Sequence, residues 1–194
     1  SLVRKRSGVQ ISSLAPKKIK VSMKKTGFIL ILFIFFISCE KSVNLPADHI
    51  NKESLIEVSV ILSETCPIAQ YMTLPLKNAY DTFASDSVVF IGYFPNLLSN
   101  EISIANFVEK YSIPFNCIDD NDAEMVSLLG ATVYSEVFIR LDGNLVYKGM
   151  IDDSYTDLGE WSPAQNNYLY NVLEQLLDGN NLEYFETEAV GCLI

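Results

Sequence analysis

From residue 54 onward, apolar runs and amphipathic stretches alternate along the chain. Runs rich in β-branched and aromatic residues predict strands, and apolar residues spaced three and four apart predict helices. In order, the pattern predicts strand, helix, strand, helix, strand, helix, a hairpin of two strands and a last helix. The predicted ranges are 54–62, 67–83, 87–93, 101–111, 114–118, 122–129, 136–141, 145–147 and 163–177.

Residues typical of helix ends and turns support these boundaries. Pro67 suits the first turn of a helix, whereas Pro75 should kink the same helix. Gly130 is placed to stop the helix before it, and residues 142–144 (Asp-Gly-Asn) suit a hairpin turn. The order predicts an α/β fold, a three-layer sandwich with a central mixed sheet whose parallel part precedes an antiparallel hairpin.

The N-terminal part carries a different pattern, an unbroken apolar run of ten residues at 28–37. This run is shorter than the roughly 20 residues that span a bilayer, and it suits the core of a signal peptide. Met23 and two lysines precede it, and Cys39 follows it in the order Phe-Ile-Ser-Cys. This order resembles a bacterial lipobox, which predicts a lipid anchor on Cys39. The alternative is an ordinary secretory cleavage site with a chance cysteine.

These features divide the chain into five parts. We expect an upstream or mis-started segment at 1–22, a lipoprotein signal peptide at 23–38 and a lipidated tether at 39–54. The folded domain should cover 55–180, and a tail carrying Cys192 should cover 181–194. The predicted location is the cell envelope, outside the cytoplasm and anchored to a membrane.

Charge and histidine content exclude several classes of function. Eight of the 14 basic residues and none of the 24 acidic residues precede Cys39, so the remaining chain carries a net charge of −18. Such a chain has too few lysines and arginines for nucleic-acid binding, which depends on contacts between basic side chains and phosphates. The one histidine, His49, lies in the tether, which excludes a Ser-His-Asp triad and a histidine-rich zinc site. We therefore expect no resident metal or cofactor.

Cys66 is the residue with the strongest chemical signal. It lies between a predicted strand and a predicted helix, where free backbone N–H groups and the helix dipole should lower its pKa. Glu64 beside it should raise the pKa by repulsion. The second thiol of a Cys-x-x-Cys pair would fall at position 69, which is alanine. Sites in open α/β sheets gather at the carboxyl ends of strands, and Cys66 follows such an end.

Several short runs together resemble bacterial redoxins of the alkyl hydroperoxide reductase and thiol-specific antioxidant branch of the thioredoxin-like superfamily. The runs are TCPIAQ at 65–70, FPN at 94–96, YSIPF at 111–115, LGATV at 129–133, EVF at 136–138, YKGMIDD at 147–153 and TEAVGC at 187–192. The resemblance spans about residues 56–194. It implies a thioredoxin-like fold and a redox or antioxidant role outside the cytoplasm.

The resemblance implies that Cys66 is the nucleophile, attacking a peroxide or a mixed disulfide. Ser63 stands where relatives carry threonine or serine three residues before that cysteine, and Thr65 and Pro67 flank Cys66 as supporting residues. Ser135 is a fourth expected supporting residue, and it departs from the relatives, which place a proline before the Glu-Val-Phe strand. A cis bond before serine costs about 2.5–4 kcal/mol, so we expect a trans or rearranged loop there.

The chain also differs from these relatives in its arginines. Arg140 is the one arginine after residue 38, and it lies in a predicted hairpin strand. Peroxidases of this branch place an arginine near the cysteine, so peroxide activation should be weak. Cys117 follows an apolar stretch and is expected to pack as a small hydrophobic residue.

Cys192 leaves several interpretations open. It can resolve Cys66 by closing a loop over the 125 residues 67–191, with Gly191 making the tail flexible. Such a bridge can also be a permanent structural staple. Alternatively, the thiols stay separate, or both bind Cu(I) with Met72 as a further soft ligand.

Together these features predict a membrane-anchored thiol oxidoreductase or antioxidant that acts on a disulfide or a peroxide. The alternative is a thioredoxin-fold binding module without turnover, serving protein contact or Cu(I) delivery.

Overall fold

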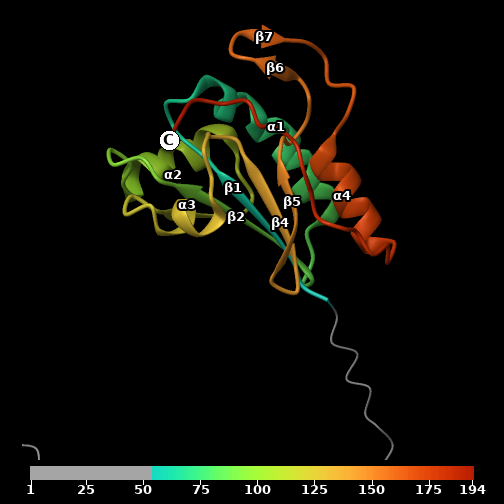
Figure 1. Ribbon diagram of the computed structural model, residues 1–194. Helices are drawn as coiled ribbons and strands as arrows, with labels where there is room; N and C mark the ends of the chain where they lie inside the picture. Colours follow the sequence, from blue (N-terminus) through green and yellow to red (C-terminus); the bar gives the residue numbers. More distant parts are fainter. Residues whose placement is uncertain (1–53) are drawn as a thin grey trace, which may run out of the picture. The chain divides into compact units, whose positions relative to one another are not determined.

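A computed structural model describes residues 54–194 (Figure 1). Its strands are β1 (Ile56–Ile61), β2 (Val88–Phe94), β3 (Asn116–Asp119), β4 (Val137–Leu141), β5 (Asn144–Gly149), β6 (Tyr155–Asp157), β7 (Glu160–Trp161) and β8 (Phe185–Glu186). Its helices are α1 (Pro67–Phe83), α2 (Glu101–Tyr111), α3 (Glu124–Leu129) and α4 (Tyr168–Leu177). The predictions for residues before 54, including the lipid anchor on Cys39, lie outside the described residues.

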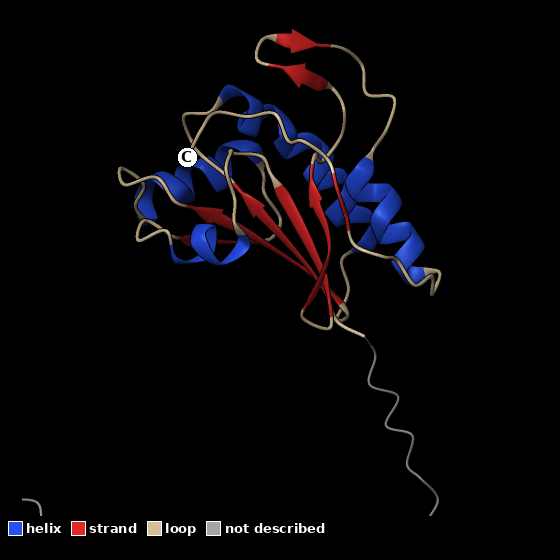
Figure 2. Ribbon diagram, viewed as in Figure 1, coloured by secondary structure: helices blue, strands red, loops and turns tan. Residues whose placement is uncertain are grey.

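Six strands form one mixed sheet in the order β3-β2-β1-β4-β5-β8 (Figure 2). Strands β1, β2 and β3 are parallel, whereas β4 is antiparallel to β1 and to β5. Strand β8 adds to the far edge in parallel with β5. The prediction of a thioredoxin-like α/β sandwich with a central mixed sheet is confirmed.

The two faces of the sheet bury different sets of residues. Because side chains alternate along a strand, Val58 and Val60 of β1 face one cluster and Ile61 faces the other. The larger cluster receives the apolar faces of α1, α2 and α4, and the smaller one packs against α3. Central strand β1 is thus covered on both sides, and its carboxyl end leads directly to Cys66.

Helices α1 and α2 have the predicted bounds, but β3, α3 and α4 begin later than predicted. Helix α3 starts only at Glu124, because the Asp120 carboxylate accepts the Met125 and Val126 N–H groups and holds the preceding turn. Helix α4 starts after Asn167, whose side chain caps it. Helix α1 continues through Pro75.

Strands β6, β7 and β8 were not predicted. Two of them have only two residues each, and β6 has three, so their sequences carry no detectable period. Strands β6 and β7 form a separate hairpin between β5 and α4. None of the helices within residues 54–194 is long and apolar enough to cross a bilayer.

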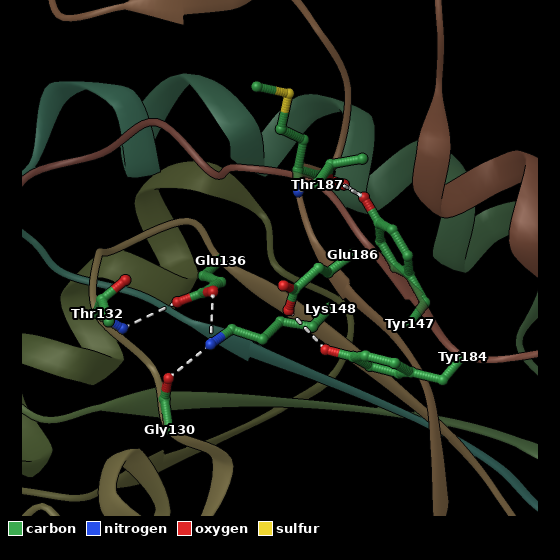
Figure 3. Close-up of polar contacts among 9 residues, drawn as sticks. Gly130, Thr132, Glu136, Tyr147, Lys148, Tyr184, Glu186 and Thr187 are labelled. Atoms are coloured by element: carbon green, nitrogen blue, oxygen red, sulfur yellow. Dashed lines mark hydrogen bonds and ion pairs between the residues drawn. The ribbon is translucent and has the colours of Figure 1, made fainter.

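Thr187 fixes the tail to the sheet directly after β8 (Figure 3). Its hydroxyl shares a 2.7 Å hydrogen bond with the Tyr147 hydroxyl and accepts one of 2.8 Å from the Met150 N–H. Its own N–H donates to the Lys148 carbonyl. A Cβ on Gly149, whose φ is +141°, would overlap with Thr187. Glycine at 149 therefore allows the tail to lie against β5.

Replacing Gly149 by alanine should lower the free energy of unfolding by about 2–4 kcal/mol, because the new methyl group overlaps with Thr187. Gly143→Ala is the matched control, since its φ is also positive (+83°) but nothing lies within 4 Å of its added Cβ. The control should lose only about 1–2 kcal/mol. Urea unfolding measures both, and equal losses would contradict the close packing at Gly149.

Candidate active site

Cys66 is the N-cap residue of α1, as the sequence predicts. Its backbone is extended (φ −84°, ψ 114°), Pro67 occupies the first helical turn, and the Gln70 N–H donates to the Cys66 carbonyl at 3.0 Å. The thiol therefore lies where the first N–H groups of a helix have no partner within the helix. Cys66 is only 2% exposed.

The loop before Cys66 is held by its own hydroxyl groups. The Ser63 hydroxyl is 3.1 Å from the Thr65 hydroxyl and accepts the Thr65 N–H at 3.3 Å. Ser63 is fully buried, whereas Thr65 and Pro67 are exposed. Three of the four predicted supporting residues thus flank Cys66 along the chain, and Ser135 is the fourth.

Glu64 is bound to α2 rather than left free beside the thiol. Its two carboxylate oxygens accept hydrogen bonds from the Ser99 hydroxyl (2.8 Å) and the Ser103 hydroxyl (2.6 Å). The Gln70 side chain donates to the Glu64 carbonyl. These contacts tie the Cys66 loop to the start of α2 and fix the direction of the carboxylate.

Ser135 lies in the loop that precedes β4. Within residues 54–194 there is no cis peptide bond, so the expected trans loop is confirmed. Ser135 adopts a left-handed backbone (φ +75°), its N–H donates to the Ile61 carbonyl at 2.7 Å, and its hydroxyl donates to the Val190 carbonyl at 3.0 Å. Ser135 therefore connects the end of β1 with the tail.

Residues 192–194 pair with residues 132–134 as a short antiparallel ladder. The Tyr134 N–H donates to the Cys192 carbonyl at 2.9 Å, and the Ile194 N–H donates to the Thr132 carbonyl at 3.3 Å. Val133 and Leu193 face each other between these two bonds. The tail thus returns to the end of the sheet where Cys66 lies.

Gly191 makes this approach possible by its small size. A Cβ at Gly191 would overlap with the Tyr134 carbonyl oxygen and lie 3.2 Å from the Ser135 hydroxyl. The sequence suggested that Gly191 makes the tail flexible. In the structure, glycine instead allows close contact with the loop before β4.

The returning tail brings the two predicted cysteines together. Burial raises the pKa of Cys192 to about 11, with further contributions from hydrogen bonding to Cys66 and from the charge of Cys66. Both thiols are free in the structure. The pair therefore has the arrangement of a nucleophile and a second thiol, although 125 residues separate them in sequence.

Tyr134 also belongs to this site, although no role was predicted for it. Burial raises the pKa of its phenol; a hydrogen bond with Ser63 opposes this, and the charges of Cys66 and Glu64 add to it. The phenol therefore shares the surroundings of the thiol pair. The one feature of the sequence that could have indicated this role is the position of Tyr134 directly before Ser135.

A partly buried ion pair supports the loop that the tail contacts (Figure 3). Glu136 accepts the Thr132 N–H at 2.9 Å and lies 3.4 Å from the Lys148 ammonium, which also donates to the Gly130 carbonyl at 2.7 Å. The backbone of residues 130–136 is therefore fixed from β5. These contacts hold the loop at Gly130 and Thr132, next to the residues that pair with the tail.

Of the other residues considered from the sequence, Cys117 and Arg140 lie in other strands of the sheet, whereas Met72 lies on α1. Cys117 packs against Gly92 in the sheet, and burial raises its pKa to about 12. Arg140 pairs with Glu57 near the opposite end of β1. Met72 is buried and lines a cavity of about 10 Å³ with Ser135 and Val190. Within residues 54–194, no group of three or more His, Cys, Asp or Glu side chains is arranged to hold a metal.

No protein-family model matches the chain, and no curated protein matches it. Among solved structures, an uncharacterized conserved protein from Geobacillus kaustophilus has a TM-score of 0.65 and 19% identity over 73% of this chain and 78% of that one. A hypothetical protein from Sinorhizobium meliloti 1021 has a TM-score of 0.62 and 16% identity over 73% and 80%. These structural similarities support the α/β fold and carry no information on function.

The contact between the thiols should be visible in the pH dependence of alkylation. Because iodoacetamide attacks thiolates, the rate at Cys192 should rise with a midpoint near pH 11. In Cys66→Ala the hydrogen bond and charge of Cys66 are gone, so the midpoint should fall. Cys117 in the same sample is the control and should keep a midpoint near 12. An unchanged Cys192 midpoint in Cys66→Ala would contradict the contact.

Proposed function

We propose that the protein is a thiol–disulfide oxidoreductase in which Cys66 is the nucleophile and Cys192 is the resolving thiol. The observation that supports this proposal is the return of the tail, which brings the Cys192 thiol to the N-terminus of α1. A purely structural role for the tail requires no second thiol at that point.

The proposed reaction moves two electrons from the protein to a disulfide substrate. The Cys66 thiolate attacks one sulfur of the substrate, a bond forms between Cys66 and that sulfur, and the other half leaves as a thiolate. The Cys192 thiolate then attacks the Cys66 sulfur and releases the second half. The substrate gains two electrons and two protons, and the protein keeps a Cys66–Cys192 disulfide.

The high pKa of Cys192 suits its place in this sequence. While Cys66 is free, the Cys192 thiol is protonated at neutral pH, because its pKa is about 11. Once Cys66 is in a mixed disulfide, its charge and its hydrogen bond to Cys192 are gone. The deprotonation of Cys192 therefore becomes easier at the step that needs its thiolate.

A disulfide substrate fits the site better than a peroxide. Arg140, the one arginine after residue 38, pairs with Glu57 at 3.4 Å near the other end of β1. The described site therefore holds no guanidinium to polarise a peroxide oxygen. An antioxidant role would act through disulfides rather than through direct peroxide reduction.

The proposed location is the outer face of a membrane in the cell envelope. The support for it is the sequence order of Met23, two lysines, the apolar run 28–37 and Cys39. A lipid on Cys39 would hold the folded domain near the membrane surface, joined by the tether 39–54.

A stoichiometric reduction experiment tests the proposed reaction. All proteins in the test carry Cys39→Ser, so that the Cys39 thiol does not add to the count. The reduced full chain is mixed with oxidised glutathione, and the released glutathione thiol is counted per protein. The unchanged protein should release two thiols and Cys192→Ser one, because the mixed disulfide at Cys66 is not resolved. Cys66→Ser should react at least about 100-fold more slowly, whereas Cys117→Ser should match the unchanged protein, since burial holds that thiol protonated.

Equal thiol release by Cys66→Ser and the unchanged protein would contradict the proposal. In that case the alternative, a binding module of thioredoxin-like fold without turnover, becomes the better account.

A further inference from the structure

Backbone groups, rather than side chains, hold residues 192–194 against the loop before β4. Two hydrogen bonds join this strand to the Tyr134 N–H and the Thr132 carbonyl. The Leu193 side chain is 82% exposed and that of Ile194 is 41% exposed. The loop therefore binds the extended backbone of the tail and makes little contact with its side chains. A strand edge binds a foreign peptide in the same way.

The strand also lies beside the proposed nucleophile, Cys66. Cys66 is 2% exposed, and Cys192 occupies the position in the strand from which a thiol reaches it. A large disulfide substrate must bring its own sulfur to the same point. The 192–194 strand and such a substrate therefore compete for this edge, and Cys192 must return to it to resolve the mixed disulfide.

The tail is attached more firmly upstream than in its last residues. Thr187 makes three hydrogen bonds with β5 and the residue that follows it, and the Val190 carbonyl accepts the Ser135 hydroxyl. Residues 192–194 can thus leave the loop while the rest of the tail keeps its place.

We propose that residues 192–194 are a displaceable strand that competes with a cysteine-bearing extended polypeptide for the edge formed by residues 132–134. The inference rests on the proposed function, and it adds a competition between the tail of this chain and the substrate at the same edge. In the bound register, the carbonyl of the peptide cysteine accepts the Tyr134 N–H. The N–H two residues later donates to the Thr132 carbonyl, and the N–H between them points away from the loop, as that of Leu193 does.

The covalent step balances as a thiol–disulfide exchange. The Cys66 thiolate attacks the peptide cysteine sulfur of a peptide–thionitrobenzoate mixed disulfide. The new bond joins Cys66 to the peptide, the old sulfur–sulfur bond breaks, and coloured thionitrobenzoate leaves with the electron pair. No external oxidant is needed.

The test compares two proteins that both lack the resolving thiol, Cys192→Ser and a deletion of residues 192–194. Both also carry Cys39→Ser, so that Cys39 does not react with the probes. The probe is a nonapeptide with one central cysteine activated as the thionitrobenzoate disulfide. Thionitrobenzoate release should be at least about tenfold faster in the deletion variant, because the edge is free. Free 5,5′-dithiobis(2-nitrobenzoate) is the small-disulfide control, and its rate should change less.

N-methylated peptides test the register directly. Methylation two residues after the cysteine removes the N–H that donates to the Thr132 carbonyl, so most of the tenfold gain should be lost. Methylation one residue after the cysteine blocks an outward N–H and should leave the gain in place. This pair differs only in the position of one methyl group.

A second variant controls for misfolding of the deletion variant. Cys192→Ser combined with Ile194→Pro keeps the chain length and removes the N–H that bonds to the Thr132 carbonyl. This variant should also release thionitrobenzoate from the peptide faster than Cys192→Ser does. The midpoint of its thermal unfolding should stay near that of Cys192→Ser.

The outcomes separate this inference from the proposed function. In one outcome, the deletion variant and the Ile194→Pro variant react with the small disulfide at Cys66 but react with the peptide no faster than Cys192→Ser does. This outcome, or equal rates with the two methylated peptides, would contradict the displaceable strand and leave the proposed oxidoreductase in place. If Cys66 reacts with neither probe, the proposed function fails and the inference fails with it.

Discussion

The site depends on the contact between the returning tail and the loop before β4. Gly191 lies against the Tyr134 carbonyl, the Ser135 hydroxyl donates to the Val190 carbonyl, and backbone pairing continues to residue 194. Upstream, Thr187 fixes the tail to β5. Without these contacts, Cys66 is a single thiol at a helix N-terminus. With them, it has a partner that the adjacent sequence does not provide.

A partner on the tail gives the pair a property that a Cys-x-x-Cys helix turn lacks. In a helix turn, the second thiol is part of the same rigid element as the first. Here Cys192 lies on a strand held by two backbone bonds, whereas Cys66 is fixed by α1 and by the hydroxyl contacts of its loop. In the proposed reaction, the same short ladder thus couples the position of the resolving thiol to the access of substrate to the nucleophile.

The sequence predicted the parts of this site that depend on local signals. Cys66 was placed correctly because a buried strand, a proline and a helical pattern follow one another there. The path of the tail was beyond prediction, because the contact of Thr187 with Tyr147 joins residues 40 positions apart and the tail has no period. For the same reason Gly191 was interpreted as a flexible residue, and Tyr134 received no role, since only the folded chain brings them together.

The most direct test of the central claim is a map of the cysteine linkages during a glutathione redox titration of the full chain, by alkylation, digestion and mass spectrometry. The account predicts one linkage among the described cysteines, Cys66 to Cys192, which opens near the glutathione potential while Cys117 stays free. A Cys66–Cys192 linkage that survives strongly reducing glutathione would identify a structural staple. Two free thiols at every potential, or a linkage to Cys117, would contradict the account.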